Sequence, residues 1–406
     1  MSEFIKQGGW PRGINNRANE KRLPEGFLRD SVNVDPAESG VLTLRSGYKT
    51  VYQGTDVRGA LAVGDYILIA DGSNLVMYDA ATDTHQTIAT IAGAGIFAGT
   101  VFNDELFFCT ENQCLRFKRG SLRRWGVPTV TAQPVPTVGS GGLSAGTYQM
   151  AMTWVNSHGE EGGTVNGISV DVPDGSALQI TVPSLPGHTP RLYMTAQNGS
   201  TFYRQTSVSG AYLASSVRTD TERLETMHMR EPVPSRHVTA VSSVITMVEG
   251  AVLWFTDPMQ PHLRQPMRGF AQFASDIGFV AAAGNGVYVS ADKTYYLRSL
   301  AGDDVEQSEV LPYPGVSGTT TSLPAVRGED FDRVAWMTRH GLAVGDSSGR
   351  VSLLSQDNFV PQLADHGSSG IVEHNGSQLV VSTMRSVRGA NPMVAGDYYE
   401  AEVITP

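Results

Sequence analysis

The residue types that most often carry chemistry are sparse in this sequence. Cys109 and Cys114 are its two cysteines, and they flank a short turn within one expected hairpin. They could pair across the two strands, but two cysteines in 406 residues are no disulfide framework, so we expect reduced, partly buried thiols. The histidines never fall at metal-ligand spacing. The sequence therefore predicts neither a metal site nor a cofactor.

Paired carboxylates are a second candidate, because two neighbouring acids can divide general acid and base roles between them. Three such pairs occur, at Glu160-Glu161, Asp303-Asp304 and Glu329-Asp330. Each pair lies in a polar turn, where we expect solvated loop acids. The sequence contains no nucleophile elbow, zinc-protease helix, phosphate-binding loop or cysteine quartet. We therefore predict no catalytic residue and no enzyme activity.

His262 is the one histidine in a notable setting. It follows Asp257 and Pro258 in a proline-bracketed loop, directly after a strand that ends in Trp254-Phe255. A rigid loop on such a scaffold contacts a partner more often than it carries a reaction. We interpret Asp257, Pro258 and His262 as a candidate partner contact. A plain turn is the main alternative, and a catalytic role for His262 is a remote one.

The elements that position these residues repeat along the chain. Residues 61–79 read as three short strands joined by a Gly-Asp turn and an Asp-Gly-Ser-Asn turn, which is the pattern of a β-meander. Five weaker copies follow, at residues 99–118, 244–265, 279–299, 334–354 and 370–384. In four copies a polar pair stands where the first hairpin reverses, as expected for a type I′ turn, namely Gly64-Asp65, Asn103-Asp104, Asn285-Gly286 and Asn375-Gly376.

This repetition predicts an all-β protein. Radial repetition leaves few open sheet edges, so we expect a β-propeller of about six blades. A β-sandwich or two unrelated sheets is the alternative. The 44 glycines, 21 prolines and 17% charged residues suit a turn-rich all-β chain, and no 3.6-residue apolar periodicity indicates a long helix.

The pattern changes between residues 127 and 234. Tyr148, Met150, Met152 and Trp154 alternate along one expected strand and would face the same side. Further strands are expected at residues 168–172, 177–182, 191–196 and 200–205, whereas residues 129–142 read as a linker too polar to pack. Short strands at this spacing predict an inserted β-sandwich, which is fibronectin-III-like because the Cys-Trp-Cys spacing of true immunoglobulin domains is missing.

We therefore divide the chain into a basic N-terminal arm (1–36), a first propeller part (37–126), the inserted sandwich (127–234) and a second propeller part (235–406). The arm carries six basic side chains between Lys6 and Arg29 and few apolar anchors, of which Trp10 is one. It should dock on a surface of its own or another chain, and a frayed terminus is the alternative. Around residues 35–40 we expect either a hairpin or a strand that enters the first blade, and residues 398–404 could supply the partner strand that closes the ring.

A formal net charge of −10 argues against a basic face that wraps nucleic acid. It is compatible with an acidic wall along which a duplex can slide. The N-terminus lacks the apolar region of a signal peptide, and no run approaches the ~18 apolar residues of a membrane span. We expect synthesis and assembly in the cytosol.

Several motifs together resemble bacteriophage tail proteins of the nozzle, or packaged-DNA stabilisation, type. Gly13 to Asn16 read G-I-N-N, and residues 23–48 follow the pattern L-P-x-G-F-x-R-D-S-V-N-V-D-P-x-x-x-G-x-L-x-x-R-x-G-Y. Residues 143–148 match an L-x-x-G-x-Y strand, and residues 156–161 match the N-x-x-G-E-E turn after it. Residues 254–262 resemble a strand that reads aromatic, x, x, Asp-Pro, then His.

The resemblance implies a virion structural protein that forms a six-fold ring below the head-to-tail adaptor, with a channel that holds the leading DNA end and opens for ejection. Its partners would be further copies of itself and the adaptor or portal complex, with tail fibre or tailspike proteins as additional candidates. DNA would pass without sequence-specific binding. Within the arm, our candidates for contacting a neighbouring copy or the adaptor are Trp10, Arg12, Arg17, Lys21 and Arg22.

Two other functions remain open at this stage. The first is a baseplate or tail-tip protein of a long-tailed phage, which differs only in its position in the particle. The second is a carbohydrate-binding or glycan-cleaving propeller with an accessory sandwich. Repeated Asp-box turns would favour it, but the nearest echo, at residues 345–351, lacks the tryptophan and does not recur.

Overall fold

The computed structural model describes residues 9–31, 34–36, 40–44, 50–131, 133–302, 304–323, 332–361, 363–374 and 377–386. These residues form many small antiparallel sheets, and their one helical segment is the short 3-10 turn η1 (Glu20–Arg22). The prediction of an all-β protein is thus confirmed. The chain divides into two compact units, Met1–Gly54 with Phe273–Ser299 and Glu306–Pro406, and Thr55–Gln272 with Leu300–Val305. We call them unit 1 and unit 2.

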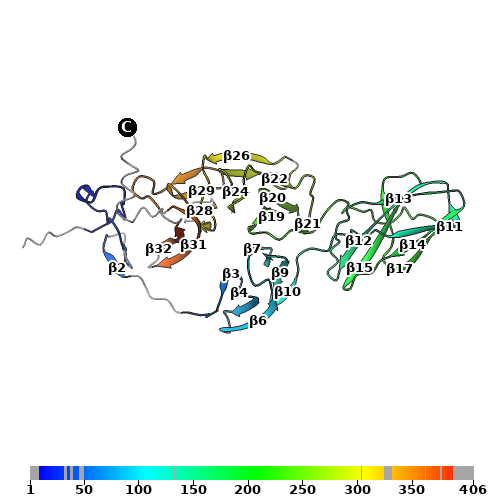
Figure 1. Cartoon of the computed structure of the whole chain (residues 1–406), viewed down its shortest axis with the longest axis horizontal. Helices are drawn as coiled ribbons and strands as arrows, with labels where there is room; N and C mark the ends of the chain where they lie inside the picture. Colours follow the sequence, from blue (N-terminus) through cyan, green and yellow to red (C-terminus); the bar gives the residue numbers. More distant parts are fainter. Residues whose placement is uncertain are drawn as a thin grey trace, which may run out of the picture. The chain divides into compact units, whose positions relative to one another are not determined.

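Unit 2 contains three meander sheets, whose strands follow the sequence order (Figure 1). The first consists of β3 (Val57–Val63), β4 (Tyr66–Asp71), β5 (Asn74–Asp79) and β6 (Thr84–Thr90). The second consists of β7 (Phe97–Phe102), β8 (Glu105–Thr110), β9 (Cys114–Lys118) and β10 (Ser121–Arg124). The third consists of β18 (Val238–Val241), β19 (Val244–Glu249), β20 (Val252–Asp257) and β21 (Gln260–Arg264), with β22 (Phe270–Gln272) paired to β20.

Neighbouring meander sheets of unit 2 pack face to face. Leu68 and Leu75 of the first sheet share a buried cluster with Phe108 of the second. On its other face the second sheet contributes Phe107 to a cluster with Ile245 of the third. The first and third sheets therefore stabilise the second, because together they bury both of its faces.

Tight two-residue turns produce these meanders. Asn103 and Asp104 both have positive φ (52° and 57°), as a type I′ hairpin turn requires. At the Gly64-Asp65 reversal, positive φ (56°) is recorded for Gly64 alone, so this turn is of the II′ kind and the expectation of a type I′ turn was wrong there.

Unit 2 also contains a module of two sheets between residues 127 and 234, which we call the two-sheet module. One sheet has the order β13-β12-β15-β16 and the other the order β11-β14-β17. Its strands are β11 (Val135–Leu143), β12 (Gly146–Asn156), β13 (Ile168–Val172), β14 (Ser176–Val182), β15 (His188–Thr195), β16 (Phe202–Thr206) and β17 (Gly210–Ala214). Both sheets contribute to one apolar cluster, in which Met150 and Met152 of β12 meet Leu178 and Ile180 of β14. Tyr148 and Trp154 belong to the same cluster, so the predicted alternation along β12 is confirmed.

The prediction of a linker at residues 129–142 is wrong, because most of this segment forms strand β11. Most side chains of β11 are exposed, so no apolar alternation marks the strand. Its pairing with β14 depends on the backbone, and Gly141 lies so close to β14 that an added Cβ would approach the Cβ of Ala177 to 2.4 Å. Polar and glycine-rich strands of this kind escape pattern analysis.

Unit 1 contains two four-stranded meanders and two hairpins. The meanders are β23 (Phe279–Ala283), β24 (Gly286–Ser290), β25 (Thr294–Arg298) and β26 (Glu306–Leu311), then β27 (Thr321–Leu323), β28 (Arg333–Thr338), β29 (Gly341–Asp346) and β30 (Val351–Leu353). The hairpins are β1 (Val34–Pro36) with β2 (Leu42–Leu44), as expected around residues 35–40, and β31 (Ala364–His374) with β32 (Ser377–Ser386). Phe279, Tyr288 and Trp336 join the two meanders in one aromatic core.

One predicted turn of unit 1 lies a residue earlier than expected. Ala283 pairs with Gly286, so the chain reverses at Gly284-Asn285 rather than Asn285-Gly286, and Gly284 has the positive φ (59°). The predicted turn at Asn375-Gly376 and the predicted strand at 398–404 lie outside the described residues, as do Asp303, Glu329 and Asp330 of two carboxylate pairs.

Candidate functional site

The loop that carries Asp257, Pro258 and His262 belongs to the hairpin of β20 and β21. Asp257 pairs with Gln260, and the turn between them includes Met259 with positive φ (60°). Asp257 and His262 are half-buried and Pro258 is exposed. Burial raises the pKa of Asp257, opposed by the positive charges of Arg268 and His262.

His262 faces the two-sheet module. Burial lowers its pKa, and Glu160 of the module opposes this shift with its negative charge. The N-x-x-G-E-E turn (residues 156–161) and the Asp-Pro loop are therefore neighbours in space, although about a hundred residues separate them in the sequence.

A buried ion pair joins the same turn to the second meander sheet. Arg116 of β9, with a side chain 3% exposed, donates from Nη2 to Oε2 of Glu160, whose side chain is 20% exposed. Asn156 also donates to Glu160, from Nδ2 over 2.7 Å. Burial alone would raise the pKa of Glu160, but these hydrogen bonds and the charge of Arg116 outweigh it and lower the pKa to about 2. Glu160 is therefore ionised throughout the physiological range.

Arg116 is held from the meander side as well. Its guanidinium lies over the ring of Phe107, 5.7 Å from the centroid, and its Nε is 3.6 Å from Oε1 of Glu105. That distance is too long for a hydrogen bond but close enough for attraction between the charges. Glu105 in turn accepts from Arg123 over 2.9 Å. We call Arg116 and Glu160 the junction ion pair.

The carboxylate of Glu161 is bound within the module, whereas its backbone is hydrogen-bonded to His262 of β21. It accepts from Thr153 Oγ1 and Arg191 Nη1 over 2.5 Å each, and from the hydroxyl of Tyr193 over 2.7 Å. Burial, followed by the nearby Glu161, raises the pKa of Tyr193. The expectation that Glu160 and Glu161 are solvated loop acids was thus wrong, because both carboxylates lie in a structured turn that buries them against cationic partners.

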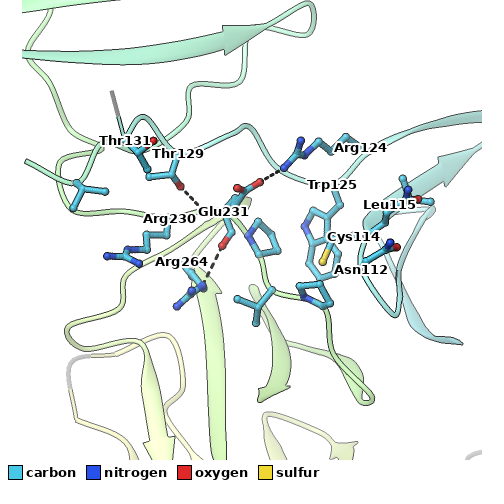
Figure 2. A pocket seen from close by; sticks show the side chains of 15 residues that line it. Asn112, Cys114, Leu115, Arg124, Trp125, Thr129, Thr131, Arg230, Glu231 and Arg264 are labelled. Carbon is cyan, nitrogen blue, oxygen red and sulfur yellow. Dashed lines mark hydrogen bonds and ion pairs between the residues drawn. The ribbon is translucent and has the colours of Figure 1, made fainter. Parts of the chain in front are cut away.

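A cavity of about 690 Å³ lies beside this junction (Figure 2). Its walls come mainly from the two segments that connect the module to the meander sheets and from the β8–β9 hairpin, with Val165 of the module and Arg264 of β21 completing them. Glu231 is the centre of its polar contacts: its carboxylate pairs with Arg124 (2.5 Å), its backbone N–H donates to Thr129 (3.2 Å), and its carbonyl accepts from Arg264 (3.0 Å), as Figure 2 shows. The outgoing and returning segments are thereby held together.

Within unit 1, the N-terminal arm contacts residues 356–360 of the same chain. The Asn16 side chain donates to the carbonyl of Val360 and accepts from its N–H, both over 2.8 Å. The Asn16 N–H donates to the carbonyl of Asn358 over 3.0 Å, and Arg17 Nη1 donates to the carbonyl of Gln356 over 2.6 Å. We call this set the arm contact. It makes the G-I-N-N motif a docking element for the arm's own chain.

The other arm residues point elsewhere. Trp10 is half-buried and its N–H donates to the carbonyl of Gly40 over 2.8 Å. Arg12 lies over the ring of Phe27, 5.5 Å from its centroid. Lys21 and Arg22 are exposed in η1. The predicted contact residues therefore fall into two groups, the arm residues in unit 1 and the Asp257–His262 loop in unit 2.

Sequence reasoning missed the residues that hold these groups in place. Arg116 stands in an apolar strand, and an arginine flanked by Leu115 and Phe117 was a signal that a buried partner exists. Asn16 is the last residue of the G-I-N-N motif, but nothing in the sequence indicated residues 358–360 as its partner.

In the part of the chain that the structure describes, no three His, Cys, Asp or Glu side chains gather as a metal site would require. No described helix is long and apolar enough to cross a membrane. The charged groups at the junction are mutually neutralised.

No protein-family model matches the sequence, and no curated protein sequence matches it. Among solved structures, the chain is similar to the N-terminal domain of Nup159, with 14% identity over 86% of this chain and 77% of that one, at a TM-score of 0.33. It is also similar to BBS1N in its complex with ARL6DN, with 10% identity over 80% of this chain and 88% of that one, at a TM-score of 0.29. Likenesses at this level do not identify a shared function.

Proposed function

We propose that this chain is a structural protein of a bacteriophage tail, which forms a nozzle ring below the head-to-tail adaptor. The ring retains packaged DNA and provides the channel for its ejection. One observation carries the proposal: three of the motifs that resemble nozzle proteins make contacts between segments distant in the sequence. G-I-N-N forms the arm contact, and the N-x-x-G-E-E turn and the Asp-Pro-to-His strand face one another at the junction. Contacts of this kind hold the shape of the chain, which is what a structural component of an assembly requires.

In this proposal the successive meanders are blades of a β-propeller with about six blades, and the two-sheet module is an inserted fibronectin-III-like sandwich. The burial of both faces of the second meander between its neighbours supports the stacking of blades. The contacts of Glu231 with Arg124 and Thr129 support the insertion, because the chain leaves and returns at one place.

The ring is a closed assembly of identical copies, six in our proposal, in which one flank of each copy meets a different flank of the next. It matures in the host cytoplasm and resides in the virion. A net charge of −10 suits a channel that does not grip phosphate, so DNA passes without sequence-specific binding. The adaptor or portal complex is the upper partner, and tail fibre or tailspike proteins are candidates for the outer surface.

Antibody labelling of whole particles from the source lysate, viewed by electron microscopy, tests this function. We expect label on a short tail stump beneath the head. Label at the tip of a long tail would instead make the chain a baseplate or tail-tip protein. Particles without label would direct attention to glycan binding.

A pair of charge substitutions tests the role of the arm. Lys21 and Arg22 are exposed and lie outside the arm contact. The double variant Lys21→Gln and Arg22→Gln should therefore fold normally but join tails poorly, because the adaptor or neighbouring copy loses two cationic partners. Complementation of a mutant phage measures this. Normal incorporation would remove the arm from the assembly surface, and Arg236→Gln, which changes an exposed arginine outside the arm, is the matched control.

A further inference from the structure

Cys109 and Cys114 lie directly opposite each other on β8 and β9. Thr110, the next residue along β8, donates its N–H to the carbonyl of Gln113 over 2.8 Å, so that pair is hydrogen-bonded. In an antiparallel ladder the two kinds of pair alternate, which makes Cys109 and Cys114 a non-hydrogen-bonded pair, the kind whose side chains come closest. Their Sγ atoms are 3.2 Å apart.

We propose that Cys109 and Cys114 form a redox-active dithiol that closes to an intrachain disulfide on exposure to a small disulfide oxidant. A cross-strand pair with about 4.5 Å between Cα atoms falls within the range that a disulfide spans. Bonding would bring the sulfurs from 3.2 Å to about 2.0 Å, which side-chain rotation supplies with little backbone movement. This inference depends on the hairpin geometry and not on the nozzle function.

The two thiols differ in access. Cys109 is completely buried, and its Sγ lies 3.7 Å from the carbonyl of Val233 in the returning segment of the module. Cys114 is 9% exposed and lines the cavity beside the junction (Figure 2). An oxidant that enters the cavity therefore meets Cys114 first.

The reaction has two steps. The Cys114 thiolate attacks one sulfur of the oxidant RSSR, forms a mixed disulfide and releases one RS⁻. The Cys109 thiolate then attacks the Cys114 sulfur and releases the second RS⁻. The two cysteines lose two protons and two electrons, and RSSR becomes two RSH.

The environment of the pair slows its oxidation. The hydrogen bond with Cys109 and burial raise the pKa of Cys114, so its thiolate is scarce at neutral pH. The reaction should be slow in a reducing cytosol and should accelerate at higher pH. Once formed, the disulfide is shielded by the same burial.

The test uses the full chain, reduced, freed of reductant and incubated with excess oxidised glutathione at pH 8. Free thiols are counted after denaturation and alkylation, and the intact mass is measured. We expect free thiols to fall from two to zero per chain, with a mass loss of two hydrogens and no retained glutathione. Two remaining thiols, a lasting glutathione adduct or a disulfide-linked dimer would each overturn the proposal.

Two variants separate the steps. Cys109→Ala removes the resolving thiol, so Cys114 should stop as a stable glutathione adduct. Cys114→Ala should leave the buried Cys109 unmodified in the folded chain. An adduct on Cys109 in the second variant, or none on Cys114 in the first, would contradict the assigned order of attack. The wild-type thiol count remains decisive if either variant folds poorly.

Discussion

The junction ion pair of unit 2 and the arm contact of unit 1 both hold distant segments of the chain together, but they do so with different chemical groups. Each joins segments distant in sequence, 44 residues apart for Arg116 and Glu160 and 344 apart for Asn16 and Val360. The first uses two charged groups that are largely removed from water. The second uses the Asn16 amide against backbone groups, with one exposed charged donor, Arg17. A buried charge is costly when its partner is lost, whereas a neutral hydrogen bond costs less to break and does not titrate.

The comparison teaches that the two regions should respond to different perturbations. Acid should weaken the junction ion pair, and added salt should weaken the more exposed pair between Arg124 and Glu231. The arm contact around Asn16 should be largely indifferent to both. The following experiments test this difference, beginning with the largest expected effect.

Arg116→Met should destabilise unit 2 by about 3 kcal/mol. The substitution keeps much of the apolar stem but leaves Glu105 and Glu160 without their shared buried cation. Urea unfolding followed by tryptophan fluorescence measures the free energy of unfolding. A loss below about 1 kcal/mol would show that water replaces the arginine and that the ion pair does not hold the module.

Asn16→Ala should weaken the arm contact by roughly 1–3 kcal/mol, because the carbonyl and N–H of Val360 lose their partner. Hydrogen exchange at the Val360 amide is the direct readout, and its rate should rise by about ten-fold or more. Asn19→Ala, at an exposed turn, is the matched control and should leave that amide unchanged. Equal exchange rates in both variants would mean that Asn16 does not hold the arm.

Glu160→Gln should cost roughly 1–3 kcal/mol at pH 7, because the neutral amide can keep the hydrogen bonds but leaves the buried Arg116 without its negative partner. Its main effect should be on pH dependence. The folded-state pKa of Glu160 is lowered to about 2, so its contribution to stability is complete above about pH 5 and is lost as the pH falls toward 2. Urea unfolding at pH 7, 5 and 3 should show that the free energy of unfolding falls less with pH in the variant than in the wild type. If it fell equally in both proteins, the assigned pKa would be contradicted.

Arg124→Met should have the smallest effect, within about 1 kcal/mol. Arg124 pairs with Glu231 much as Arg116 pairs with Glu160, but its side chain is 56% exposed. It is therefore the matched control for Arg116→Met. Added salt should further reduce the small difference in stability between the variant and the wild type. If Arg124→Met lost as much stability as Arg116→Met, burial would not explain why the two ion pairs differ.

The meanders were predictable because their signals are local. Asn103-Asp104 reads as a tight turn wherever it stands between apolar strands, and the structure has it there. Strand β11 was not predictable, because its exposed side chains carry no pattern and its place is set by pairing with β14. Gly284-Asn285 shows the limit of turn prediction, since two glycines flank Asn285 and either could have been the reversal.

The candidate site was predictable in its parts and not in its assembly. His262 was identified from its proline-bracketed loop, whereas Glu160 was expected to be a solvated loop acid. The proximity of the two depends on how the module packs against β9 and β21. Long-range pairing of this kind has no sequence signature in a single chain. The buried arginine in β9 was the one local hint, since an unpaired cation is rarely buried.

The contact between Thr129 and Glu231 has a consequence for how such a chain can change over time. Because the two-sheet module enters and leaves at a single point, changes of length in its loops away from the junction need not displace the rest of unit 2. A gene that exchanges the module must, however, keep an acidic partner for the buried Arg116 of β9. The distant loops of the module can therefore evolve at a different pace from the turn that carries Glu160.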